Sequence, residues 1–223
     1  MENTIPLSQK LYLLGIHPEK GGIVSSAYSA MDYIILGTLF LELFQQKNIR
    51  FENKRIVVLN TKADSEVHRF LLKKFSTAKS PLKISRWINK LYFSLKYIRK
   101  EVQQGLVEKR LIKMESRRFL FFKWKTPVVL NKQAVYRLES EIESQIFKGT
   151  VQEEELLLLS FIKPAGLLRR LFPEREKRKK ASQKLKSMMV DNQVSQAVAD
   201  AISAAQAVAA SAAASAAVSA SVS

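Results

Sequence analysis

Residues 84–124 read ISRWINKLYFSLKYIRKEVQQGLVEKRLIKMESRRFLFFKW, and this stretch decides the fold. Its first half carries one stripe of apolar residues, spaced alternately three and four positions apart: Ile84, Trp87, Ile88, Leu91, Leu95, Ile98 and Val102. This spacing keeps side chains on one face of an α-helix. We therefore predict one continuous amphipathic helix, which Gly105 is placed to end.

The second half of the stretch predicts a β-hairpin over about residues 110–125. We expect a first strand over residues 110–114 and a polar turn over residues 115–118. A second, aromatic strand then covers residues 119–125, and Pro127 closes the hairpin.

The strand FLFFKW (residues 119–124) is unusual because both of its faces are apolar. Side chains alternate across a strand, which places Phe119 and Phe121 on one face and Leu120, Phe122 and Trp124 on the other. One face can pack on the helices, whereas the other needs a second protein layer, a partner or a membrane. Five cations crowd the same hairpin: Lys113, Arg117, Arg118, Lys123 and Lys125. Cations around exposed aromatics are typical of binding to an anionic bilayer; a strand buried inside the domain is the equal alternative.

Outside this stretch the chain predicts a mainly α protein. Helical spacing recurs over residues 29–46, 64–76, 131–147 and 153–162, and a β-type run covers residues 55–59. The most apolar run, residues 30–44, contains two carboxylates and is too short to span a bilayer, so we expect a buried core helix. Residues 209–223 contain only Ala, Ser and Val. We expect a domain of residues 1–208 followed by a frayed or disordered tail.

The charge of the chain is strongly positive. Lys and Arg number 37 against 20 Asp and Glu, which gives a net charge of +17. The densest basic run, residues 169–186, has nine Lys or Arg and two Glu. Such a field favours an anionic partner, whether nucleic acid, an acidic membrane surface or an acidic protein.

Candidate catalytic groups are few. The absence of Cys rules out disulfides, thiolate nucleophiles and cysteine zinc sites, and it fits a reducing compartment. His17 precedes a Pro in a turn and is expected to be a surface loop residue. His68 follows Asp64 by four residues and pairs with it as a helix neighbour, without a third partner. The glycine spacing matches neither a P-loop nor a dinucleotide fingerprint. We predict no catalytic residues, no metal, no cofactor and no enzyme activity.

Lys96 and Arg99 form a second basic feature. They lie three residues apart on one flank of the predicted helix, with Lys100 beyond them. Two neighbouring cations can hold a phosphate, Arg through two hydrogen bonds and Lys as a point charge. Taken alone, two cations at this spacing usually lie on a solvent-exposed helix face and bind nothing.

Residues 95–122 resemble the hairpin region of the Golgi phosphoprotein 3 family. The matching elements are LVEK (residues 106–109), Glu115 and FLxF (residues 119–122), at the same spacing. Three further segments are similar to other motifs of the family, in the same order: LYLLGIHPEKGG (residues 11–22), GTLFLEL (residues 37–43) and LLLL (residues 156–159). The resemblance extends over about residues 5–208, and the lack of a long basic N-terminal extension makes the chain similar to a bacterial-type member.

The resemblance implies an apolar helical bundle, wrapped by amphipathic helices, with one projecting β-hairpin. In eukaryotic members the hairpin tip enters the bilayer, and a basic pocket beside it binds phosphatidylinositol-4-phosphate. By position, Lys96 and Arg99 match two Arg of that pocket. The pocket's aromatic and third Arg fall near Ala27 and Leu36, and Tyr28 is the nearest aromatic replacement. Phe119 and Leu120 match the inserting tip, and we expect the apolar side chains of the aromatic strand to insert: Phe119, Leu120, Phe121, Phe122 and Trp124.

These observations predict a cytoplasmic, peripherally membrane-associated protein whose partner is an anionic phospholipid membrane. Family members also hold cytosolic tails of membrane proteins, so an adaptor role is compatible with this prediction. The alternative is a nucleic-acid-binding protein that uses the basic helix–hairpin surface. Its weakness is the apolar strand, because three Phe and one Trp within six residues are unusual in a wing that reads DNA.

Overall fold

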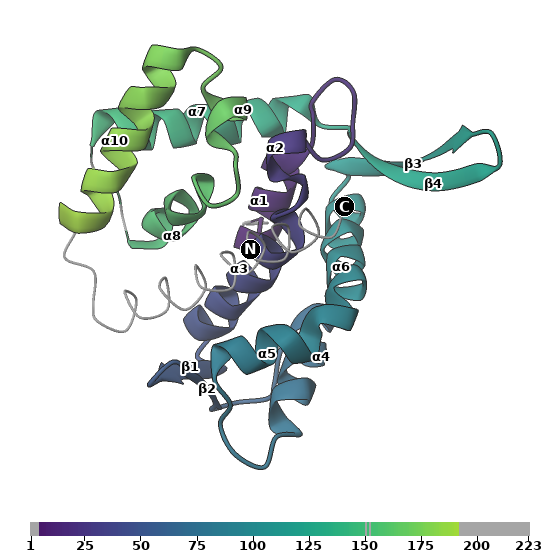
Figure 1. The fold of residues 1–223 in the computed structure, drawn as a ribbon, viewed down its shortest axis with the longest axis vertical. Helices are drawn as coiled ribbons and strands as arrows, with labels where there is room; N and C mark the ends of the chain where they lie inside the picture. Colours follow the sequence, from purple (N-terminus) through teal and green to yellow (C-terminus); the bar gives the residue numbers. More distant parts are fainter. Residues whose placement is uncertain (1–4, 150, 152, 192–223) are drawn as a thin grey trace, which may run out of the picture.

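The computed structural model describes residues 5–149, 151 and 153–191, so the tail predicted from residue 209 lies outside the described residues. The protein is mainly helical, as predicted (Figure 1). The longer helices are α1 (Leu7–Gly15), α3 (Met31–Gln45), α4 (Glu66–Ser76), α5 (Ile84–Leu91), α6 (Leu95–Glu108), α7 (Lys132–Lys148), α8 (Glu153–Ile162) and α10 (Arg175–Asp191). Two helical turns, α2 (Ser25–Tyr28) and α9 (Leu168–Leu171), complete the set. No helix within the described ranges has the length and hydropathy needed to cross a membrane.

Helix α3 forms the centre of the core, as the apolar run of residues 30–44 predicts. Its side chains are buried from Met31 to Leu43 with the exception of Asp32. A helix that is apolar on all sides needs partners all round, and α1 and α6 pack along it (Figure 1). The core helix therefore positions α6, which leads directly into the hairpin.

The seven-residue stripe of residues 84–102 is buried throughout, as its spacing predicts. The prediction of one continuous helix is wrong, because a 3₁₀ turn, η1 (Tyr92–Ser94), separates α5 from α6. A 3₁₀ turn winds more tightly than an α-helix, so Leu91 and Leu95 both stay in the core while the chain changes direction. Gly105 does not end the helix, which continues to Glu108. A Cβ at Gly105 would meet the terminal amide of Gln9, so this glycine lies against the Gln9 side chain of α1.

The predicted hairpin exists, but its turn lies elsewhere. Strand β3 (Ile112–Phe119) pairs with β4 (Phe122–Val129), and the turn is Leu120–Phe121. The predicted polar turn, residues 115–118, is paired strand, and Pro127 lies inside β4 rather than closing the hairpin. Polar residues are a poor turn signal here because the ribbon projects into solvent (Figure 1), where both faces of a strand can be polar.

A smaller hairpin, β1 (Ile49–Glu52) with β2 (Arg55–Val58), precedes α4. The sequence predicted only its second strand. Its two-residue turn, Asn53 and Lys54, has positive φ angles of 49° and 59°. Two positive φ angles are typical of the type I′ turn that matches strand twist.

The base of the long hairpin is held by the turn at Gly21 and Gly22. The N–H of Gly22 donates to the Pro127 carbonyl over 2.8 Å. Gly21 has a φ of 69°, and a Cβ there would lie 2.8 Å from the Pro127 carbonyl oxygen. This glycine therefore lets the turn lie against β4.

We expect Gly21→Ala to destabilise the protein by about 2 kcal/mol or more, because left-handed backbone strain of about 1–2 kcal/mol adds to a clash with rigid backbone. Gly22→Ala is the matched control: its φ is 71°, but the nearest neighbouring atom to its Cβ would be 3.7 Å away. Urea unfolding of both variants measures the difference. Equal losses for the two would contradict the close packing at Gly21.

Candidate functional site

The tip of the long hairpin exposes five large apolar side chains. Relative exposure is 93% for Phe121 and at least 47% for the other four: Phe119, Leu120, Phe122 and Trp124. This excludes the alternative of a strand buried inside the domain. Exposed aromatics gathered at one point of a monomer mark an interaction surface.

The register corrects the predicted assignment of faces. Phe119 pairs with Phe122, and Arg117 pairs with Trp124. Residues directly opposite in an antiparallel pair share a face, so Phe119, Phe122 and Trp124 lie on one face, and Leu120 with Phe121 forms the turn. The opposite face near the tip carries cations: Arg118, Lys123 and Lys125. The tip is therefore aromatic on one face and basic on the other.

Leu120 has a φ of 52° although it is not glycine. The left-handed conformation costs an L-residue about 1–2 kcal/mol, and glycine is preferred at the first position of a two-residue turn with this φ. Burial does not offset the cost, because Leu120 is 65% exposed. Strained residues that packing does not require are found at functional sites.

Few of the hairpin's cations are neutralised. Lys113 pairs with Glu115 at 2.6 Å, and Arg117 donates to the Lys20 carbonyl over 2.6 Å at the hairpin base. Within the described part of the chain, Lys123 and Lys125 form no ion pair. The basic charge around the aromatic tip therefore remains available to an anionic surface.

The second predicted site residue, Arg99, is paired inside the protein. Its Nη1 donates to both carboxylate oxygens of Asp32, at 3.0 and 3.1 Å. Burial raises the pKa of Asp32, and Arg99 opposes that rise. Burial also raises the pKa of the neighbouring Tyr12 to about 12, and its hydroxyl accepts a hydrogen bond from Gln103. Arg99 therefore belongs to a half-buried polar cluster between α3 and α6.

Lys96 is exposed on α6, one turn before Arg99. Tyr28, at the end of α2, is 74% exposed and has no hydrogen bond or ring contact with Lys96 or Arg99. The positions expected for the pocket's aromatic and third Arg, Ala27 and Leu36, are both fully buried. The structure thus brings Arg99 to Asp32 and leaves Lys96 and Tyr28 open to solvent.

The basic run of residues 169–186 begins on α9, beside α2, and continues on α10, which lies on the opposite side of the molecule from the hairpin (Figure 1). Some of its cations hold the helix in place. Arg170 pairs with Glu139 at 2.7 Å, and Lys177 pairs with Glu143 at 2.7 Å. The protein therefore has two separate basic regions rather than one continuous surface.

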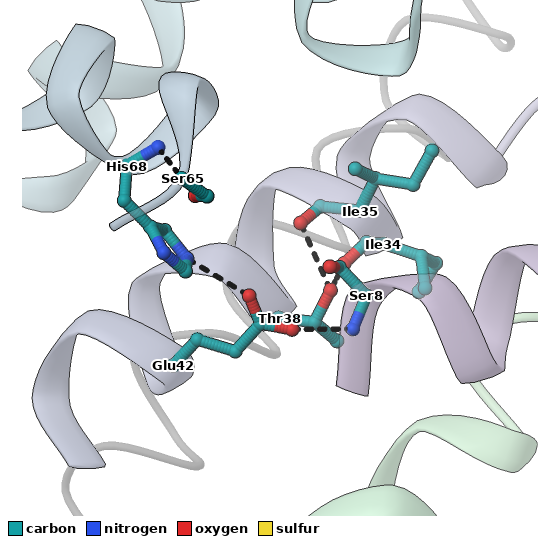
Figure 2. Close-up of polar contacts among 7 residues, drawn as sticks. All are labelled: Ser8, Ile34, Ile35, Thr38, Glu42, Ser65 and His68. Carbon is teal, nitrogen blue, oxygen red and sulfur yellow. Dashed lines mark hydrogen bonds and ion pairs between the residues drawn. The ribbon is translucent and has the colours of Figure 1, made fainter. Parts of the chain in front are cut away.

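A buried polar cluster links α1, α3 and α4, and the sequence did not predict it (Figure 2). Glu42 accepts hydrogen bonds from the backbone N–H of Ser8 at 2.6 Å and contacts His68 Nε2 at 2.9 Å. The predicted pairing of His68 with Asp64 is wrong: Ser65 caps α4, and the imidazole turns inward to α3. A Glu within a very apolar helix was the available signal, since a buried carboxylate needs partners.

We expect His68→Ala to destabilise the protein by about 3 kcal/mol, because it removes one of the partners of a buried carboxylate. Glu42→Gln keeps an oxygen for Ser8 and an amide for His68, so we expect a loss of only about 1 kcal/mol. Urea unfolding at neutral pH measures both. An unchanged midpoint for His68→Ala would show that the cluster contributes nothing to stability.

A pocket of about 520 Å³ opens beside this cluster, lined by residues of α1, α3, α4, α7 and α8. Among the described residues that line it, the carboxylates are Glu42, Asp64, Glu141 and Glu155, and the one Lys or Arg is Lys10. In a chain with a net charge of +17, an acidic pocket is a local reversal of charge. None of the predicted site residues lines it.

The architecture defines a class: a helical bundle with a central apolar helix and a projecting hairpin whose tip is aromatic and basic. The family model described as Golgi phosphoprotein 3 (GPP34) matches residues 7–205, and the chain belongs to that family. No individual curated protein matches the chain. The family is one of non-enzymatic lipid-binding and adaptor proteins, associated peripherally with Golgi membranes.

Proposed function

We propose that the chain is a peripheral membrane protein that binds anionic phospholipid head groups and inserts its aromatic hairpin into the bilayer. The inserting residues are Phe119, Leu120, Phe121, Phe122 and Trp124. The head group, of the phosphatidylinositol-4-phosphate type, lies against Lys96, with Arg99 and Tyr28 nearby.

The single observation that carries this proposal is the hairpin tip. It exposes Phe121 almost completely and keeps Leu120 in a strained conformation where glycine would relieve the strain. On a surface that faces only water, neither the exposed Phe121 nor the strained Leu120 stabilises the protein. At a bilayer interface an apolar turn is favourable, since the bilayer buries its side chains and attracts the neighbouring cations.

The magnitudes support reversible attachment. Each surface cation near an anionic bilayer contributes about 1 kcal/mol, and each aromatic side chain that is buried contributes about 1.5–3 kcal/mol. Three cations and two inserted side chains reach a binding free energy that holds the protein at a membrane without anchoring it permanently.

The same geometry disfavours nucleic acid as the partner. A basic surface that binds nucleic acid needs cations along one continuous face, whereas α10, which carries most of the basic run, and the hairpin lie on opposite sides of the molecule (Figure 1). Leu120 and Phe121 also form the turn at the end of the hairpin, and neither side chain can form a hydrogen bond with a phosphate or a base.

A second candidate function, as an adaptor for cytosolic tails of membrane proteins, has its own support in the acidic pocket. Four carboxylates around apolar walls such as Leu138 and Ile142 suit a tail that carries basic and apolar side chains. The two functions use different faces, so one protein can perform both.

Co-sedimentation with vesicles tests the main proposal. We expect binding to phosphatidylcholine vesicles that contain phosphatidylglycerol or phosphatidylinositol-4-phosphate, and none to phosphatidylcholine alone. A gel shift with duplex DNA at the same ionic strength tests the rival, since salt weakens both kinds of binding. Tight DNA binding without vesicle binding would overturn the proposal.

A further inference from the structure

A second aromatic patch lies at the joint between α5 and α6, far along the chain from the hairpin tip. Tyr92 and Phe93 occupy the 3₁₀ turn, with ring centroids 5.3 Å apart in an edge-to-face arrangement. Phe93 is 92% exposed, nearly as much as Phe121, and Tyr92 is 55% exposed. We call Tyr92, Phe93 and the adjoining Tyr97 the elbow patch.

The elbow patch is a consequence of the break in the helix. The 3₁₀ turn keeps Leu91 and Leu95 in the core, and the two residues that follow Leu91 therefore face outward. A continuous solvated helix surface favours polar residues at such positions, and nothing in the packing of the described chain calls for a Phe there. Tyr97 continues the patch on α6 and packs on Phe70 of α4 at 4.8 Å.

Cations surround the elbow patch. Lys90, Lys96 and Lys100 are exposed on α5 and α6, and within the described ranges none of them forms an ion pair. Lys74 lies over the Phe70 ring at 5.5 Å. The chemistry resembles that of the hairpin tip: exposed aromatics, with exposed and unpaired cations a few residues away along the same helices.

Helix α6 connects the two features and sets their distance. Its 14 residues span about 21 Å. The elbow lies at its start and the hairpin leaves from its end (Figure 1). The buried stripe of α6 faces α1 and α3, so Lys96 and Lys100 face outward between the two aromatic points.

We infer that the elbow patch is a second membrane contact, in which Phe93 and Tyr92 enter the head-group region of an anionic bilayer while the hairpin inserts. This inference rests on the proposed membrane binding and adds an orientation, with the outer face of α6 against the lipid. Two separated contacts fix the tilt of the protein, which one hairpin cannot do. The charge complementarity of the surrounding lysines favours a bilayer over an apolar protein partner.

The chain has no Cys, so single cysteines can carry an environment-sensitive dye without further changes. We would label Phe93→Cys, Phe121→Cys and Tyr136→Cys, the last an exposed position on α7. With phosphatidylcholine–phosphatidylglycerol vesicles, we expect a blue shift at positions 93 and 121 and none at 136. In unlabelled protein, Phe93→Ser should weaken binding about tenfold and Tyr136→Ser should not.

The possible results distinguish a failure of the proposed membrane binding from a failure of the elbow contact alone. If the wild-type chain ignores anionic vesicles, the proposed function fails, and this inference fails with it. If the wild type binds and position 121 shifts, but position 93 does not and Phe93→Ser binds normally, only the elbow contact is overturned. Self-association without lipid that Phe93→Ser abolishes would assign the patch to a second copy instead, and would also overturn it.

Discussion

Leu120→Ser, Phe121→Ser and Phe122→Ser combined should abolish binding to anionic vesicles while leaving the fold intact. The three side chains are 65%, 93% and 73% exposed, so their removal costs the folded protein less than about 1 kcal/mol. In the bilayer each contributes about 1.5–3 kcal/mol when buried, and the triple change therefore lowers affinity by a factor of at least about 100. Vesicle co-sedimentation and urea unfolding of the same preparation measure the two effects.

The matched control is Leu130→Ser with Tyr136→Ser, which removes two side chains of about 50% exposure away from the hairpin tip. We expect normal binding from that variant. A folded triple mutant that still sediments with vesicles would refute insertion.

Leu120→Gly separates strain from function at the same position. We expect it to raise the free energy of unfolding by about 0.5–1 kcal/mol, because glycine relieves the left-handed backbone at a small entropic cost. We expect it to weaken vesicle binding at the same time, since the turn loses its apolar side chain. A variant that is both more stable and weaker in binding identifies Leu120 as a residue kept for the membrane.

The sequence predicted most of the helices because their apolar spacing directly reflects burial. The stripe from Ile84 to Val102 is buried as predicted, and the apolar run of α3 is the core. The break at η1 was not predicted because a 3₁₀ turn preserves the stripe and changes only the direction of the axis.

The hairpin turn was predicted at the polar residues, and this prediction was wrong for a physical reason. Residues 115–118 are polar, yet they are paired strand, since a ribbon in solvent has no buried face to enforce apolar alternation. The actual turn is Leu120–Phe121, a pair that no turn preference favours. The proposed function accounts for this choice, because residues that insert into a bilayer differ from the residues that turn most easily.

The sequence did not identify Asp32 as the partner of Arg99, or Glu42 as the partner of His68. In both pairs the partners lie on different helices, 67 and 26 residues apart. Spacing along one helix identifies neighbours on that helix only. The sequence therefore gave no means of knowing that one of the predicted cations, Arg99, pairs with Asp32.

Asp32→Asn should strengthen binding to anionic vesicles, because it leaves the Arg99 charge uncompensated beside the lipid. The gain should be about 1 kcal/mol, or roughly fivefold, on the scale of one surface cation. Lys96→Gln should lower affinity by a similar factor, and Lys96→Gln with Arg99→Gln by about 2 kcal/mol. Phosphatidylglycerol and phosphatidylinositol-4-phosphate vesicles should respond alike, since the positions of the pocket's aromatic and third Arg are the buried Ala27 and Leu36.

The raised pKa of Asp32 gives this prediction a pH dependence. A carboxyl whose pKa is higher in the folded than in the unfolded state contributes stability that is full below the unfolded value and is lost as the pH rises through the folded one. At neutral pH the charged Asp32 is therefore a cost, and Asp32→Asn should not destabilise the fold. As the pH falls towards the pKa of Asp32, the wild type should release Arg99 and bind anionic vesicles more tightly, whereas Asp32→Asn should lack this contribution. Equal acid responses of the two proteins in co-sedimentation would show that Arg99 does not face the lipid.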